Sequence, residues 1–461
     1  MLPVVLEKAG AVGGLARTES HDGYRFDIGG HRFFTRIGEI DRLWRRMLGE
    51  DLLKVQRLSR IYYQGRFFDY PLNLTGTLRR LGAAESSLIL LSYLKAKLFP
   101  HRPEETFEHW VTNRFGSRLY RRFFQAYTEK VWGMPCELIQ ADWAAQRIGG
   151  LSVMQALIHP FRGGNGPATL TKEFLYPVLG PGMMWERFAQ AVTAGGGRVE
   201  LGADVTRLEH AGGRVTKVAV CKDGAVSEIS ARHFISSMPL ADLIARLCPP
   251  PPQAVGSAAG RLKYRAFIMV ALLYNRQELF PDHWVYVHTP SLKVARVQNF
   301  KRWSRAMVAD PAKTCLGAEY FCDEGDSLWN SSDESLVALA RGELDELGLA
   351  GWQDFEHGIV IRQAKAYPVY DRDYRPSLAT IRQYLAGFEN LQVVGRNGMH
   401  RYNNQDHSML TGLLAARNIL GGGGPQAGIL RLGSPRYDLW SLNSDGVVDT
   451  AAAPPTAGRD R

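Results

Sequence analysis

The sequence predicts an α/β protein that combines a Rossmann-like, dinucleotide-binding domain with a mainly helical insert and a substrate domain built on an antiparallel sheet. Three observations predict this. A short β-branched run at residues 3–6 ends in the acidic Glu7 and is followed by closely spaced glycines. Amphipathic, helix-like stretches fill most of residues 36–144. Residues 263–366 alternate with a period of two in several runs, which is typical of an antiparallel sheet with one open face.

The composition is that of a globular protein with an excess of basic residues. The chain has 461 residues, of which 45% are hydrophobic and 22% charged, and its formal net charge is +10. This charge favours a phosphorylated small molecule or a membrane surface as partner over nucleic acid, because the Lys and Arg residues form no cluster. The five cysteines lack CxxC spacing, which predicts neither a metal site nor a disulfide framework and fits a cytoplasmic location.

One apolar run needs an interpretation of its own. Residues 88–91 are LILL within SSLILLSYLKAKLFP, and the run is too short for the roughly 20 residues of a spanning helix. We expect a helix buried in the core. A helix that lies on a membrane surface is the alternative, because Lys95 and Lys97 follow the run. The first ten residues hold too short an apolar stretch for a signal peptide. The sequence does not decide between a monomer and a homodimer.

Glu7 stands where a dinucleotide fold places the residue that holds ribose. A carboxylate at the end of a parallel strand accepts two hydrogen bonds from a vicinal diol. The complete motif has a Gly-rich turn about 20 residues upstream. Here the sequence begins at the second strand, so we expect the first strand and its GxGxxG loop to be absent. Either the start codon is placed too late, with about 30 residues missing, or the chain is a remnant with exposed sheet edges and no cofactor.

The opening segment resembles a known family. Residues 7–17, EKAGAVGGLAR, are similar to the E-x(5)-GG-x-x-R signature of the amine-oxidase-like flavoproteins. The resemblance implies that Glu7, Gly13, Gly14 and Arg17 bind FAD, with Arg17 near the pyrophosphate. Glycines let a backbone approach a ligand closely.

Residues 26–34, FDIGGHRFF, are similar to the segment that passes the flavin ring in UDP-galactopyranose mutases and protoporphyrinogen-oxidase-like enzymes. The resemblance implies that Gly29, Gly30 and His31 lie beside the isoalloxazine ring.

Several weaker matches follow in the order the family would have them. YTEKVW at 127–132 resembles a mutase helix that lines the sugar-nucleotide pocket, which implies substrate contacts for Tyr127 and Trp132; two aromatic residues at this spacing are also common in cores. RVELGADVTRLE resembles the third parallel strand, with Val205 beside adenine. FISSMPL resembles the return strand and implies a cofactor role for Met238. A Tyr-Pro turn at Tyr367 would approach the active site.

The most specific match lies near the end of the chain. LQVVGRNGMHRYNNQDHSM at 391–409 reads as a buried strand, a polar loop and the start of a helix, whose free N–H groups suit the electron-rich edge of a flavin. It resembles the mutase motif GR-x-G-x-x-RY-x-D-x-D, which implies substrate contacts for Arg401 and Tyr402. Asn404 replaces an acidic residue of that motif and puts the substrate in doubt. The implied cofactor residues are Gly395, Arg396, Asp406, His407, Ser408 and Met409.

These matches imply a domain plan and a function. Residues 1–70, 185–260 and 385–422 would form the FAD-binding domain, 71–184 the helical insert, 261–384 the substrate domain and 423–461 a loosely ordered tail, in which Tyr437 and Trp440 can dock. The resemblance implies an FAD-dependent enzyme that acts on a nucleotide-sugar-like diphosphate through the reduced flavin, with His31, Arg401 and Tyr402 as catalytic residues. The alternative is a hydride-removing oxidoreductase that acts on an apolar or amine substrate.

Overall fold

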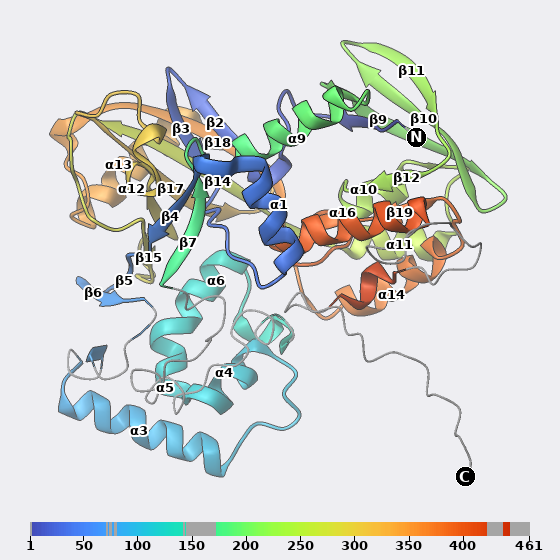
Figure 1. The fold of residues 1–461 in the computed structure, drawn as a ribbon. Coiled ribbons are helices and arrows are strands. Elements are labelled where there is room, and N and C mark those ends of the chain that lie inside the picture. Colours follow the sequence, from blue (N-terminus) through green and yellow to red (C-terminus); the bar gives the residue numbers. More distant parts are fainter. Residues whose placement is uncertain are drawn as a thin grey trace, which may run out of the picture.

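A computed structural model of the chain describes residues 2–70, 72, 76–77, 81–141, 143, 172–421 and 437–442. Figure 1 shows three parts: a large sheet with its covering elements, a helical layer below it, and a group of short strands and helices beside it. Together they form a mixed α/β fold.

The largest sheet has seven strands in the order β18-β14-β17-β16-β15-β5-β6. All neighbours are antiparallel except β15 and β5, so the antiparallel sheet predicted for 263–366 is confirmed. The strands are β5 (Ser59–Tyr63), β6 (Arg66–Asp69), β14 (Tyr264–Tyr274), β15 (Trp284–Val287), β16 (Arg296–Asn299), β17 (Thr314–Cys322) and β18 (Phe355–Pro368).

The expectation of one open face is wrong for the centre of this sheet. Nearly every residue of β14 and β17 is buried, because both faces are covered. One face packs with α13 (Asp333–Glu346). The other packs with β3 (Tyr24–Asp27) and α12 (Phe300–Trp303), and β2 (Thr18–His21) pairs with β3.

Residues 36–144 are less helical than expected. Helix α1 (Gly38–Leu48) is followed by β4 (Leu52–Gln56), which pairs with β7 (Glu173–Pro177), and by the hairpin β5-β6. Gln64 and Gly65, with φ of 49° and 74°, form the tight turn of this hairpin. Residues 59–69, expected in the cofactor domain, therefore belong to the large sheet because their alternating pattern pairs with β15.

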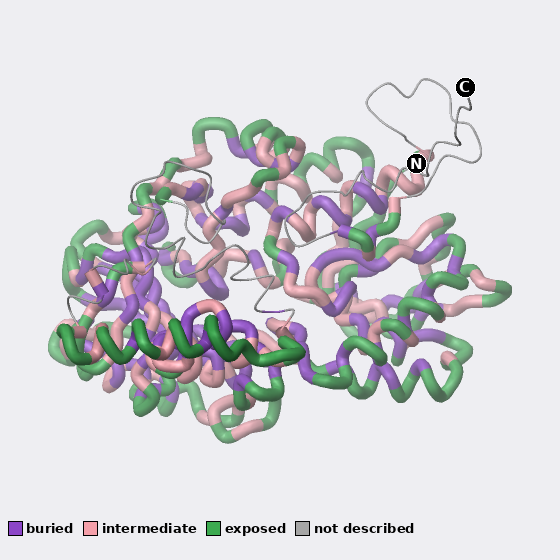
Figure 2. Tube along the Cα trace, turned by 90° about the horizontal axis from the view of Figure 1, so that it is seen from below, coloured by how far each residue is buried: buried purple, intermediate pink, exposed green. Residues whose placement is uncertain are grey.

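The helical layer consists of α3 (Ala83–Leu98), α4 (Phe107–Phe115), α5 (Ser117–Tyr120) and α6 (Ala126–Trp132). These helices lie within the range 71–184 expected for the insert, which also contains β7 and of which 144–171 lie outside the described residues. The buried helix expected at 88–91 is wrong. Helix α3 lies on the surface (Figure 2), and Leu90 and Leu91 are 57% and 61% exposed. No helix in the described part of the chain is long and apolar enough to cross a membrane.

The third part contains two separate pairs of parallel strands. β1 (Val4–Glu7) pairs with β8 (Arg198–Leu201), and β12 (Phe234–Ser236) pairs with β19 (Leu391–Val393). Helix α9 (Gly182–Ala194) accompanies the first pair, and the second lies among α10 (Leu240–Ala245), α11 (Gln253–Arg261), α14 (Tyr374–Leu385) and α16 (Gln405–Leu420) (Figure 1).

The single strand expected at 198–209 is in fact two strands. The chain turns at Gly202, where φ is +66°, and β8 is followed by β9 (Asp204–Ala211). β9 belongs to a different sheet, with β10 (Arg214–Lys222), β11 (Ala225–Ser230) and β13 (Leu247–Cys248).

Most of the expected tail at 423–461 lies outside the described residues. The exception is 437–442. The Tyr437 N–H donates to Asn418 Oδ1 at 2.7 Å, and the Arg382 guanidinium lies 4.8 Å from the centre of the Trp440 ring. The docking of Tyr437 and Trp440 is thereby confirmed.

Candidate functional site

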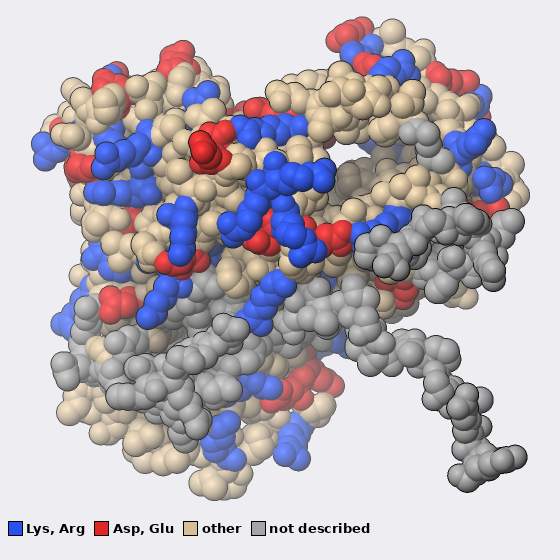
Figure 3. Space-filling model, in the orientation of Figure 1, with Lys and Arg blue, Asp and Glu red and all other residues tan. Residues whose placement is uncertain are grey.

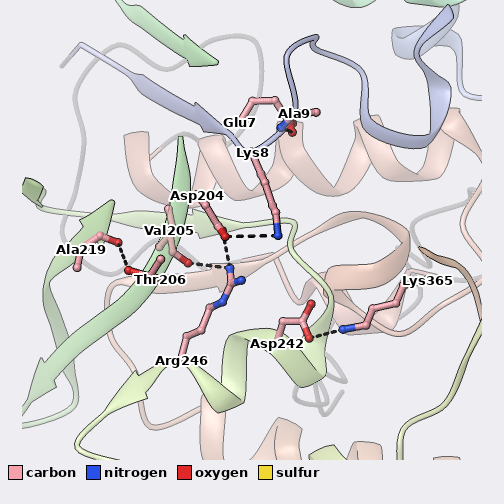
Figure 4. A network of polar contacts seen from close by, with 10 residues as sticks. All are labelled: Glu7, Lys8, Ala9, Asp204, Val205, Thr206, Ala219, Asp242, Arg246 and Lys365. Atoms are coloured by element: carbon pink, nitrogen blue, oxygen red, sulfur yellow. Dashed lines mark hydrogen bonds and ion pairs between the residues drawn. The ribbon is translucent and has the colours of Figure 1, made fainter. Parts of the chain in front are cut away.

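The end of β1 is held by its own acidic residue. Glu7 Oε1 accepts a hydrogen bond from the Ala9 N–H at 2.8 Å, and Figure 4 shows both residues above the contacts of Lys8. Lys8 Nζ lies 3.4 Å from Asp204 Oδ2. Glu7 is thus fixed where the strand ends, as a ribose-binding residue would have to be.

Val205, expected near adenine, already has a partner for its carbonyl. Arg246 Nη1 donates to Val205 O at 2.7 Å and to Asp204 Oδ1 at 3.0 Å (Figure 4). An adenine contact of Val205 stays a prediction.

The paired glycines after β1 adopt conformations that favour glycine. Gly13 and Gly14 have φ of +107° and +54°. A Cβ on Gly13 would lie 2.6 Å from Trp185 Cδ1 of α9, so the close approach seen at Gly13 is to the protein itself. Arg17 Nη1 donates to Gly14 O at 3.0 Å and to Gln363 Oε1 at 3.1 Å. Arg17 therefore ties the glycine loop to β18.

His31 is a neutral imidazole near two guanidinium groups. Burial, together with the positive charges of Arg396 and Arg296, lowers its pKa to about 3. The pKa lies so far below 7 that the ring carries no charge at physiological pH. Its Nδ1 is buried and has no hydrogen-bond partner among the described residues.

The glycines before His31 bring its segment against the large sheet. A Cβ on Gly30 would lie 2.8 Å from Gln298 Nε2 and 3.4 Å from Trp303. Gly29 has φ of +103°, and a Cβ there would lie 3.8 Å from Arg296 Nη2.

Residues 391–409 form the second side of the candidate site, opposite the segment that contains His31. After β19 comes the single turn α15 (Gly395–Gly398), with φ of +79° at Gly395. Helix α16 begins at Gln405, whose Nε2 donates to His31 O at 3.4 Å. This contact brings the first turn of α16 to the FDIGGH segment, although the two lie far apart in the sequence.

The implied cofactor residues of α16 point in different directions. The Asp406 carboxylate accepts from the His407 N–H at 2.9 Å and lies 3.0 Å from His407 Nδ1. Met409 Sδ accepts from Trp44 Nε1 at 3.0 Å, so this side chain faces α1. Ser408 follows in the same turn, and Met238 packs against the core beside α10.

Tyr367 and Tyr402 form a stacked pair. Their ring centres are 5.7 Å apart with an angle of 22° between the planes, and the Arg396 guanidinium lies 5.3 Å and 4.7 Å from the two centres. Burial raises the pKa of Tyr367 to about 12, which keeps its hydroxyl protonated. Trp132 lies 6.4 Å from both rings and is 2% exposed.

Three implied substrate residues lie apart from this pair. Tyr127 stacks on His288 with 4.7 Å between ring centres. Arg401 Nη1 donates to the carbonyl of Trp440 at 3.2 Å, so its guanidinium is held by the docked segment 437–442. Asn404 is exposed just before α16. Substrate roles for these three stay predictions.

A buried charge network in the large sheet was not predicted from the sequence. Arg296 Nη2 lies 2.6 Å from Glu319 Oε2, and Gln298 Nε2 donates to Glu319 Oε1 at 2.7 Å. Glu319 is 0% exposed. Arg296 and Glu319 face each other in the β16–β17 register. The available signal was Glu319 in the otherwise uncharged run of β17, because a charge in a core strand is unusual unless it is paired.

The residues on the two sides of the candidate site fit FAD. The buried side-chain atoms that have no hydrogen-bond partner among the described residues lie in several parts of the chain, and they include five from the segments that the resemblance assigns to the cofactor: His31 Nδ1, Ser236 Oγ, Asn397 Oδ1, Gln405 Oε1 and His407 Nε2. Buried polar atoms are normally satisfied, so a polar ligand is indicated. Figure 3 shows a hollow between the part that carries α9 and the part that carries α16.

Comparison with known proteins agrees with this geometry. The family model described as flavin containing amine oxidoreductase matches residues 3–420. The structure is similar to reduced UDP-galactopyranose mutase, with a TM-score of 0.77 and 20% identity over 90% of this chain and 89% of that one. It is also similar to a protein from Exiguobacterium sp. 255-15 provisionally named a protoporphyrinogen oxidase, with a TM-score of 0.64 and 16% identity over 86% and 88%. Putrescine oxidase with bound putrescine gives a TM-score of 0.56 and 16% identity over 90% and 93%.

Proposed function

The chain belongs to the flavin containing amine oxidoreductases and uses FAD, and from this premise we propose that it acts on a nucleotide-sugar-like diphosphate through the reduced flavin. The observation that carries the proposal is the presence of two guanidinium groups in one site: Arg296 borders Gly29 and His31, and Arg396 lies against Tyr367 and Tyr402. Arginine pairs are suited to phosphate oxygens, which accept several N–H donors at once.

The charge of the site favours an anion over an amine. Two guanidinium groups lie near His31 and only Glu319 among the described residues offsets them. In a buried site a net positive charge attracts a diphosphate and repels an ammonium group. Tyr367 and Tyr402 add a flat aromatic surface, on which a nucleobase or sugar ring can pack.

The roles of the chain's own residues follow from these contacts. Bound FAD supplies hydride exchange or, when reduced, a nucleophilic ring nitrogen. Glu7, Arg17, His31 and the start of α16 would hold it. Arg296 and Arg396 orient the diphosphate, and Tyr367 keeps its proton at the hydroxyl and donates a hydrogen bond. Trp132 closes the pocket against water.

We also propose that a further parallel strand completes the cofactor sheet between β1 and β12. The two parallel pairs are separate, and β-branched residues on both are open to solvent: Val4 and Val5 are each 39% exposed and Ile235 is 45% exposed. Such residues are normally buried in parallel sheets. Translation of the coding DNA ahead of Met1 tests this. A strand followed by GxGxxG in frame supports the proposal, and stop codons directly before Met1 count against it and favour a remnant without flavin.

Arg296→Gln tests the substrate class. With FAD bound and reduced by dithionite, we expect the parent protein to bind UDP and to convert UDP-galactopyranose to the furanose form. The variant should keep its FAD absorbance and bind UDP at least about tenfold more weakly, because it loses a charge-assisted contact of roughly 1.5–3 kcal/mol. Calorimetry measures the affinity and chromatography the product.

Arg302→Gln is the matched control. Arg302 lies on the same segment as Arg296 but forms its ion pair with Glu278 at the surface, so UDP binding should not change. If the FAD-loaded parent neither binds UDP nor forms furanose, the proposed substrate class is wrong. Reduction of the flavin by an apolar or amine donor would then identify the hydride-removing oxidoreductase.

A further inference from the structure

Helix α3 exposes its apolar face to solvent. Leu88, Leu90, Leu91, Leu94 and Leu98 are 43–74% exposed, and Phe99 directly after the helix is 75% exposed. Leu91, Leu94 and Leu98 recur at intervals of three and four residues, so they form one stripe along the helix. Figure 2 shows the helix exposed along its length on the underside of the molecule. The exposed apolar area is on the order of several hundred Å², which marks a site of interaction rather than ordinary surface.

The opposite face of α3 is bound to the protein by the buried Ile89 and Ala96 and by several polar contacts. Glu85 Oε1 lies 2.6 Å from Arg118 Nε and 3.0 Å from Arg122 Nε. Ser92 Oγ is 3.1 Å from Ser117 Oγ and accepts from the Arg118 N–H at 3.1 Å. These contacts fix the helix with its leucines outward, so that most of its large apolar side chains face solvent.

Lysines flank the exposed stripe. Successive residues of an α-helix are rotated by about 100° around its axis, so Lys95 projects on one side of the stripe formed by Leu91 and Leu94, and Lys97 projects on the other side. Neither makes an ion pair with a carboxylate in the described part of the chain. The only acidic residue of the helix, Glu85, is held on the inner side by two arginines. An apolar stripe with a lysine on each side matches the acyl and anionic headgroup layers of a lipid surface.

We propose that α3 docks the protein on anionic membranes by lying flat at the level of the lipid headgroups. A second copy of the chain fits this face less well, because a symmetric contact would bring the lysines of both copies to one interface while α3 turns no carboxylate outward. The inference is independent of the substrate of the flavin site.

Vesicle flotation with the FAD-loaded protein tests the proposal. We expect the protein to float with vesicles of phosphatidylcholine and phosphatidylglycerol, and less with phosphatidylcholine alone. The double variant Leu91→Ser/Leu94→Ser should lower the partition coefficient at least about tenfold, because less apolar area enters the bilayer. Lys95→Gln/Lys97→Gln should remove most of the preference for phosphatidylglycerol.

The matched control is Val226→Ser/Leu420→Ser. Both residues are exposed, at 68% and 59%, and lie on β11 and at the end of α16, so this variant should float as the parent does. The proposal is overturned if the parent does not float, or if the α3 serine variant floats equally well. It is also overturned if light scattering shows a dimer that this variant dissociates while neither protein binds vesicles. Should the serine variant fail to fold, the lysine variant still decides, since unchanged flotation on both lipids would contradict the proposal.

Discussion

Asp27, four residues before His31, is a buried carboxyl group. Tyr176 Oη donates to its Oδ2 at 2.6 Å and Thr18 Oγ1 to its Oδ1 at 2.8 Å. Burial raises the pKa of Asp27 to about 7, although both hydrogen bonds act to lower it. The group therefore changes charge within the physiological range.

Asp27→Asn should flatten the pH dependence of stability. The pKa is about 7 in the folded chain and about 3.9 in the unfolded one. Between these values the folded state holds a proton that the unfolded state has lost, so stability present below about pH 4 is lost as the pH rises through 7. Between pH 5 and 8 the loss is on the order of 2–3 kcal/mol. Urea unfolding of both proteins at the two pH values measures it, and equal slopes would contradict the assignment.

Local motifs in the sequence predicted site roles for Glu7, the glycine pairs, His31 and Arg396, because each belongs to a short segment whose spacing alone is informative. The Arg296–Glu319 pair could not be found in this way. Its two members lie in different strands and meet only through the β16–β17 register. The direction in which the Arg401 side chain points could not be predicted either, because it depends on where residues 437–442 dock.

At the scale of elements, the segment after β3 abuts β16. Gly30 lies against Gln298, which is itself bonded to Glu319 and is 0% exposed. Gln298 has little freedom to move, because its amide is part of the network that holds Arg296.

Gly30→Ala should therefore loosen this contact. The added Cβ would meet Gln298 Nε2 at 2.8 Å, and we expect a loss of roughly 1–3 kcal/mol in the free energy of unfolding together with weaker UDP binding. Gly256→Ala is the control, since a Cβ there meets nothing within 4 Å and lies within helix α11. It should be neutral or slightly stabilising. Equal effects of the two substitutions in thermal unfolding would refute this account.

The type of most elements was predictable, but their partners were not. The period-two runs at 263–366 predicted strands, and these strands are present. The same pattern in residues 59–63 was missed beside stronger helical stretches. The run at 88–91 was expected in the core because leucines are usually buried. The leucines of this run face solvent because Glu85 and Ser92 bind the other side of the helix to α5. These are tertiary contacts, which a local sequence pattern does not show.

At the scale of the whole molecule, Lys130 joins the helical layer to the large sheet. Its ammonium group donates to the carbonyls of Val287, Thr289 and Val294 at 3.0–3.1 Å. Burial lowers the pKa of Lys130 to about 8. One side chain of α6 thus satisfies three carbonyls around the β15–β16 connection.

Lys130→Met should weaken the attachment of the helical layer to the large sheet. The variant keeps the apolar stem but leaves three carbonyls without this donor, and we expect a loss of about 2–4 kcal/mol in the free energy of unfolding. Lys293→Met on the same connection is the control, because Lys293 is exposed, and its effect should stay within about 0.5 kcal/mol. Denaturant titration compares the two, and a difference below about 1 kcal/mol would count against the role of Lys130.

The separate parallel pairs have a consequence for biosynthesis. β1 forms its ladder with a strand almost 200 positions later, and β12 waits for β19 beyond residue 390. During translation β14, β16 and β17 can pair with one another before β19 has been made, because contacts between distant segments form late. Both parallel pairs can therefore be complete only after the ribosome has synthesised the chain as far as Val393.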